Sequence, residues 1–180
     1  MRKGILVLAA AIAAASAQTP PAPEAARQRP PTAAAATGAA RAAVIDAAAA
    51  GYRRVTWRRD LAPGSSTLVG YFDGGELRLI DETAARPGAP SLRNRYYFVN
   101  GALFYFSGEQ PVTAVGAGSA GIAPRVPVRA EFRGAMTLSA VRIEHYGEVR
   151  LDPAATSAIR RRAATLASAA AVAATAPAER

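Results

Sequence analysis

The chain has 180 residues, a formal net charge of +9 at pH 7, one histidine and no cysteine. The lack of cysteine excludes disulfides, thiolate metal sites and a lipid anchor on an N-terminal cysteine. With one histidine and no cysteine, the common nucleophile–base pairs and histidine-rich metal sites are also missing. We therefore expect no catalytic residue, no metal site and no cofactor.

Residues 1–17 have the pattern of a signal peptide. A basic pair, Arg2-Lys3, precedes an apolar stretch over 4–15, and Ala15-Ser16-Ala17 fits the small-residue pattern of a cleavage site. The apolar stretch is shorter than the roughly 20 residues that a membrane-spanning helix needs. We predict cleavage after Ala17, a periplasmic or secreted product, and no transmembrane segment after cleavage.

The net positive charge indicates which classes of binding partner to expect. Every basic residue after Lys3 is an arginine. A basic chain ordinarily suggests nucleic acid, but export removes most nucleic acid from reach. We therefore expect an envelope protein or an anionic envelope component as the partner, and no nucleic acid.

After the signal peptide, residues 18–37 are rich in proline and alanine, which predicts a disordered linker. A single domain is expected over 38–176. It begins with a helix-favouring segment at 39–50 and ends with a helix at about 154–174, for which Asp152 is the N-cap and Pro153 the first helical residue.

Between these helices the pattern predicts strands and hairpins at 52–59, 67–82, 92–107, 126–133 and 136–145. A change in the alternation of apolar residues along the last strand predicts a bulge near Ala140. The fold class is therefore α+β, an antiparallel β-meander of about six or seven strands with an N-terminal and a C-terminal helix.

The sequence contains two copies of one hairpin motif. Tyr71-Phe72-Asp73-Gly74-Gly75-Glu76-Leu77 returns 26 positions later as Tyr97-Phe98-Val99-Asn100-Gly101-Ala102-Leu103. Gly-Gly and Asn-Gly both tolerate the two positive φ angles of a type I′ turn. Such turns pair Phe72 with Leu77 and Phe98 with Leu103 across their strands.

Strict alternation outward from these turns divides the side chains between two faces. One face is the expected core: Leu68, Phe72, Leu77, Leu79, Tyr96, Phe98, Leu103 and Tyr105. The other carries Ile80 and a set of aromatic and arginine residues that we predict as the binding surface: Tyr71, Arg78, Arg95, Tyr97, Phe104 and Phe106.

This second face is too aromatic to remain open to solvent. Each aromatic side chain buries about 150–250 Å², so three uncovered rings would forgo on the order of 10 kcal/mol at roughly 25 cal/mol/Å². Something should therefore cover them. A terminal helix is the favoured cover, and a ligand or partner docked beside Arg78 and Arg95 is the alternative.

Three other patterns have ordinary interpretations. Gly116-Ala117-Gly118-Ser119-Ala120-Gly121 matches the dinucleotide-binding string, but Pro124 follows too soon for the required helix, so we predict a loop. The run Arg160-Arg161-Arg162 is typical of a solvated helix face. The carboxylate neighbours Asp81 and Glu82 point to opposite sides of a strand and do not share a site.

The repeated strands resemble those of small exported bacterial proteins of unknown function that carry Y-F-x-x-G-x-L hairpins. The likeness rests on 71–77, on 97–103 and on a partial third copy at Glu131-Phe132-Arg133-Gly134. It implies a fold and assigns no functional residue. From the residues themselves we expect a non-enzymatic exported binding or interaction module. The alternatives are a carboxylate-based cell-envelope hydrolase and an inhibitor of a cell-wall hydrolase that acts through the loop at 109–125.

Overall fold

The computed structural model describes residues 37–61, 64–87, 89–111 and 125–176. The predicted signal peptide at 1–17, the predicted linker up to residue 36 and the glycine-rich string at 116–121 lie outside these ranges. All further structural statements concern the described residues.

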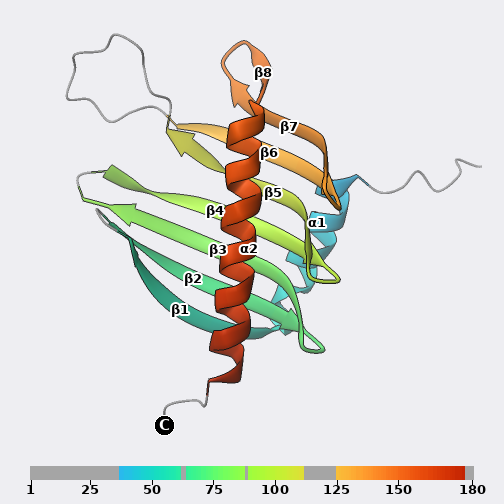
Figure 1. Ribbon diagram of the computed structural model, residues 1–180, viewed down its shortest axis with the longest axis vertical. Helices are drawn as coiled ribbons and strands as arrows, with labels where there is room; N and C mark the ends of the chain where they lie inside the picture. Colours follow the sequence, from blue (N-terminus) through green and yellow to red (C-terminus); the bar gives the residue numbers. More distant parts are fainter. Residues whose placement is uncertain (1–36, 62–63, 88, 112–124, 177–180) are drawn as a thin grey trace, which may run out of the picture. The chain divides into compact units, whose positions relative to one another are not determined.

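Eight antiparallel strands form a sheet in which the spatial order follows the sequence order (Figure 1). They are β1 (Arg53–Leu61), β2 (Gly64–Asp73), β3 (Glu76–Arg86), β4 (Ala89–Val99), β5 (Ala102–Pro111), β6 (Arg125–Arg133), β7 (Met136–Glu144) and β8 (Gly147–Arg150). The predicted α+β class and antiparallel meander are confirmed. The predicted count of six or seven strands is wrong. The eighth strand, β8, has four residues, all of them exposed, and its one large apolar residue is Val149, so it lacks the alternating apolar pattern of a strand.

Two α-helices lie on opposite faces of this sheet (Figure 1). α1 (Gly38–Ala48) continues into a 3₁₀ turn, η1 (Ala49–Gly51), and α2 (Pro153–Thr175) crosses the other face. The predicted start of α2 is confirmed, since the Asp152 carboxylate accepts the Ala155 N–H at 2.7 Å. Among the described residues, no α-helix is both long enough and apolar enough to span a membrane.

The two predicted glycine turns are confirmed. Positive φ angles occur at Gly74 and Gly75 (57° and 92°) and at Asn100 and Gly101 (50° and 74°). The resulting registers pair Phe72 with Leu77 and Phe98 with Leu103, as expected. A third hairpin turns at Gly134, whose φ is 54°.

Each of these three hairpins contains a β-bulge just after its turn. In the first, Tyr71 pairs with Leu79 and Phe72 with Leu77, so Arg78 has no opposite residue of its own. Phe104 and Leu138 take the equivalent positions in β5 and β7. A bulge was predicted near Ala140, and the third bulge lies two positions before that residue, at Leu138. A bulge adds one residue to one strand and therefore reverses the alternation beyond it.

This reversal corrects the predicted division of side chains between the two faces. Leu79 and Tyr105 lie on the α1 face, although strict alternation placed them with Phe72. Ile80 and Phe106 lie on the α2 face, although alternation placed them on the aromatic–arginine surface. Both errors have the same kind of cause, an extra residue in one strand of the hairpin: Arg78 in β3 and Phe104 in β5.

The larger core lies between the sheet and α2. The helix contributes an apolar stripe at helical spacing, Ile159, Ala163, Leu166 and Ala170, all buried. The sheet contributes large side chains from most strands: Leu68, Phe72, Ile80, Tyr96, Phe98, Phe106, Val128 and Phe132. The small side chains of α2 allow its backbone to lie close to these rings.

Candidate functional site

The α1 face contains most of the predicted binding surface, and α1 covers its aromatic centre. Tyr97 and Phe104 are 2% and 5% exposed and form one cluster with Leu79, Tyr105 and Ala42 of α1. A terminal helix is therefore the cover for these rings, which was the favoured expectation. Tyr71 packs at the border of this cluster, and Phe106 lies on the opposite face of the sheet.

The arginines of that surface already have partners within the protein. Arg95 Nη1 lies 2.8 Å from the Asp46 carboxylate of α1, which also accepts the Tyr97 hydroxyl at 3.1 Å. Arg78 forms ion pairs with Asp73 and Glu76 at the tip of the first glycine turn. The Asp46 contacts fasten α1 to the sheet, and the Arg78 ion pairs lie within the first hairpin. Together they leave little of the predicted surface for a ligand.

What remains open on this face is a pocket of about 270 Å³ between α1 and the ends of the hairpins. Of the predicted binding residues, Arg78 and Phe104 line it. The Arg41 guanidinium lies over the Phe104 ring, 4.6 Å from its centroid. Five of the six predicted residues thus lie on the α1 face, and two of these five line this pocket.

The buried carboxylates Asp81 and Glu82 are both paired with arginine. Asp81 accepts two hydrogen bonds from Arg93, one of them at 3.0 Å. Glu82 is 2% exposed and pairs with Arg162 of α2, and it accepts the Tyr96 hydroxyl at 2.9 Å. Asp81 and Glu82 lie on different sides of β3, as expected.

These partners determine the ionisation of Glu82. Burial alone raises its pKa, but the hydrogen bond and charge of Arg162, with hydrogen bonds from Tyr96 and Ser66, outweigh that effect and lower the pKa below its ordinary value. A general acid needs the opposite shift, as in glycosidases. Glu82 is therefore a structural anion that stays charged at neutral pH.

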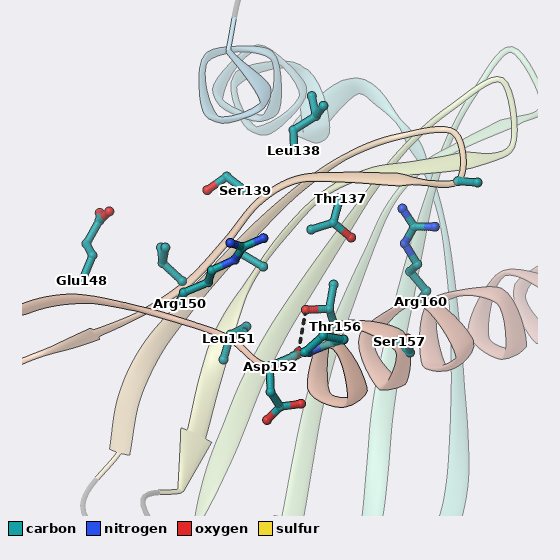
Figure 2. Close-up of a pocket in the computed structure, with 14 residues that line it drawn as sticks. Thr137, Leu138, Ser139, Glu148, Arg150, Leu151, Asp152, Thr156, Ser157 and Arg160 are labelled. Atoms are coloured by element: carbon teal, nitrogen blue, oxygen red, sulfur yellow. Dashed lines mark hydrogen bonds between the residues drawn. The ribbon is translucent and has the colours of Figure 1, made fainter.

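A larger hollow, about 1030 Å³, lies at the β7 side of the sheet (Figure 2). We call it the β7–α2 cavity. Its lining comes from β7 and the residue before it, from β8, and from the start of α2: Ala135, Thr137, Leu138, Ser139, Ala140, Val141, Glu148, Arg150, Leu151, Asp152, Pro153, Thr156, Ser157 and Arg160. Within the part of the chain that is described, no cluster of acidic and histidine side chains is suited to hold a metal ion.

Arg160 supplies an unused cationic group in this cavity. Its guanidinium lies over the Phe132 ring, 4.8 Å from the centroid. Its Nε and Nη2 atoms are buried, and neither has a hydrogen-bond partner among the described residues. Buried donors of this kind are costly when unpaired, so a ligand that accepts these hydrogen bonds gains that energy on binding.

The other charged groups of the cavity leave Arg160 available. Arg150 extends into the same hollow from β8, and it has no ion-pair partner among the residues described. The Asp152 carboxylate caps α2 and points away from both guanidinium groups (Figure 2). Glu148 lies at the far end of the lining from Arg160 (Figure 2).

Sequence reasoning missed this site because it read Arg160-Arg161-Arg162 as a solvated run. The structure gives the three arginines different environments: Arg162 pairs with buried Glu82, Arg160 reaches the cavity, and Arg161 is exposed. The available signal was the helical spacing, since Arg160 directly follows the apolar stripe residue Ile159 and Arg162 directly precedes Ala163. Comparison of the chain with protein-family models, curated proteins and solved structures yields no match.

Proposed function

We propose that this protein is a non-enzymatic binding module and that its ligand site is the β7–α2 cavity. The observation that carries the proposal is the Arg160 guanidinium, with two buried nitrogens that lack a partner among the described residues. A carboxylate or phosphate oxygen is the natural acceptor for such a group. The signal-peptide pattern at 1–17 supports an exported protein, so an anionic envelope component or envelope protein is the proposed class of ligand.

The cavity also supplies the neutral donors and apolar surface that ligand sites usually combine. Thr137 and Ser157 contribute hydroxyl groups to the same lining as Arg160, and Leu138 and Leu151 contribute apolar surface. The Thr156 hydroxyl is engaged within α2, where it donates to the Asp152 carbonyl at 3.0 Å. This mixture favours an organic anion over a simple inorganic ion.

The hydrolase alternative has less support. Glu148 and Asp152 both line the cavity, but the Asp152 carboxylate accepts the Ala155 N–H as the cap of α2. An acid–base pair needs two carboxylates that are free to exchange protons with a substrate. The inhibitor alternative relies on a loop at 109–125, of which residues 112–124 lie outside the described residues.

A matched pair of variants tests the proposal. Arg160→Gln removes the charge in the cavity, and Arg161→Gln removes an exposed charge from the same helix. We expect glutarate to stabilise the native chain by about 1.4 kcal/mol at roughly ten times its Kd. The same stabilisation is expected for Arg161→Gln.

In Arg160→Gln the affinity should fall about 10- to 100-fold, because a charged hydrogen bond contributes about 1.5–3 kcal/mol. Thermal unfolding and calorimetric titration measure both effects. Equal glutarate affinity in Arg160→Gln and Arg161→Gln would refute the assignment of the site. Unfolding of each variant without glutarate controls for loss of the fold.

A further inference from the structure

One half of β7 has an unpaired outer edge. β8 pairs only with residues Val141–Glu144 of β7, and the Leu151 N–H then donates to the Ala140 carbonyl at 2.9 Å. From Met136 to Ser139, β7 has strand pairing on its β6 side alone, among the residues that the structure describes. Backbone groups on such an edge can pair with another extended chain.

The start of α2 stands beside this edge and does not fill the space next to it. After Leu151 the chain enters α2 at Pro153, and Thr156, Ser157 and Arg160 form the helix wall of the β7–α2 cavity. The cavity is therefore a hollow between a free strand edge and a helix (Figure 2). This arrangement suits binding by strand addition, in which an extended peptide joins the sheet.

The opposite edge of the sheet differs in a way that supports this interpretation. β1 carries Arg53, Arg54, Arg58, Arg59 and Asp60, and charges on an edge strand discourage pairing with another chain. The free part of β7 reads Met-Thr-Leu-Ser and has no charge. Met136 and Leu138 are also exposed, at 59% and 44%. Of the two edges, β7 alone lacks the usual protection.

We propose that the ligand of this cavity is an extended peptide segment with alternating acidic and apolar side chains, which adds to the free edge of β7. The proposal rests on the proposed function above. Successive side chains of a strand point to opposite faces. Thr137 and Leu138 lie on opposite sides of β7, with Arg160 on the Thr137 side (Figure 2). Acidic side chains would meet Arg160, and apolar ones would meet Leu138.

Charge favours a foreign acidic peptide over a second copy of this chain. A second copy could offer its β1 edge, which would bring several arginines toward Arg150 and Arg160. It could also offer its own β7 edge, which has no acidic side chain between Met136 and Ser139. The one carboxylate of the β1 edge, Asp60, is already paired with Arg58 at 3.3 Å. An acidic segment provides an acceptor that is not paired in this way, and it complements the chain's net charge of +9.

The test uses a fluorescein-labelled probe, Ser-Val-Glu-Val-Glu-Val-Ser with blocked ends, and the full mature chain. Two matched probes accompany it: one with lysine in place of glutamate, and one with N-methyl groups on both the valine and the glutamate amides, because successive amides of a strand point to opposite edges. N-methylation keeps the charges but removes the backbone donors that strand addition requires. Fluorescence anisotropy gives the affinities, and hydrogen exchange reports on the amides at 136–139.

We expect the acidic probe to bind and the lysine probe not to bind. N-methylation should weaken binding at least about tenfold, since it removes several backbone hydrogen bonds. Arg160→Gln should weaken it by about 10- to 100-fold and Arg161→Gln should not. The amides of β7 at 136–139 should exchange more slowly in the complex.

Three results would overturn the inference. If the N-methylated probe binds as well as the parent, or β7 gains no protection, the ligand does not add as a strand. If glutarate binds through Arg160 but the acidic probe does not, strand addition fails while the proposed function stands. If sedimentation shows a dimer that protects 136–139 without any probe, a second copy occupies the edge. Failure of both glutarate and the probe would refute the proposed function as well.

Discussion

The buried pair of Glu82 and Arg162 offers a quantitative test of how α2 is held on the sheet. Glu82 is 2% exposed, while the side chain of Arg162 is 26% exposed. In Arg162→Met the carboxylate keeps the Tyr96 hydroxyl at 2.9 Å but loses its counter-charge. Breaking a buried pair costs about 3–5 kcal/mol. Because Arg162 is partly solvated, we expect a loss of about 3 kcal/mol, at the low end of that range.

Urea unfolding at pH 7 measures this loss. With a slope of about 2 kcal/mol/M, the midpoint should fall by about 1.5 M. Arg161→Met, on the exposed side of the same helix, is the control and should shift it little. The second change in Glu82→Gln/Arg162→Met should recover most of the loss, because no charge then remains buried.

The lowered pKa of Glu82 determines how the stabilisation by this ion pair changes with pH. In the native protein the pKa of Glu82 is lowered, so its stabilising contribution is present above the ordinary glutamate pKa and is lost as pH falls through the folded value. Without Arg162, burial should raise the pKa instead. The stability gap between native protein and Arg162→Met should therefore narrow from pH 7 to about pH 4. A gap that stays constant, or a variant as stable as the control, would refute the reasoning.

Two further predictions concern packing on the sheet. Gly108→Ala should destabilise the protein by about 1–3 kcal/mol in urea unfolding, because its Cβ would lie 2.3 Å from Asn94 Oδ1 and 2.6 Å from the Phe106 ring, whereas Gly51→Ala meets nothing within 4 Å and should have little effect. Asp46→Ala should speed amide exchange in α1 relative to α2, because it removes the ion pair with Arg95 at a cost of about 1 kcal/mol. Equal effects at both glycines, or unchanged exchange in α1, would contradict these expectations.

Much of the fold was predictable because its turns depend on local chemistry. Gly74-Gly75 and Asn100-Gly101 adopt the positive φ angles that their residue types favour, and these turns set the register of their hairpins. The stripe of α2 follows from helical spacing alone. Such features are encoded by residues close together in sequence.

The division between faces was less predictable because it depends on one bulge in each hairpin. The segment Leu77-Arg78-Leu79-Ile80 has apolar residues at both parities, so alternation alone cannot decide which leucine faces α2. A parity change was recognised in the last strand, and the bulge predicted near Ala140 lies at Leu138. A similar switch of apolar parity in the first two hairpins was the signal that could have predicted their bulges as well.

The candidate site was the least predictable part because it depends on tertiary placement. The β7–α2 cavity exists because β8 ends after four residues and α2 begins beside the uncovered half of β7. Neither the length of β8 nor the direction of α2 follows from the local sequence. The surroundings of Arg160 depend on Phe132 and on the β7 and β8 residues of the cavity, which are distant from it in the chain.

The most direct test of the central claim follows the Arg160 side chain itself. Its Nε–H resonance, assigned through Arg160→Gln, can be monitored by nuclear magnetic resonance while the acidic Val-Glu probe is added. The account predicts that the Arg160 signal shifts and saturates with the same Kd as the anisotropy titration, while the signal of exposed Arg161 stays in place. Saturable binding of the probe with no change at Arg160 would contradict it.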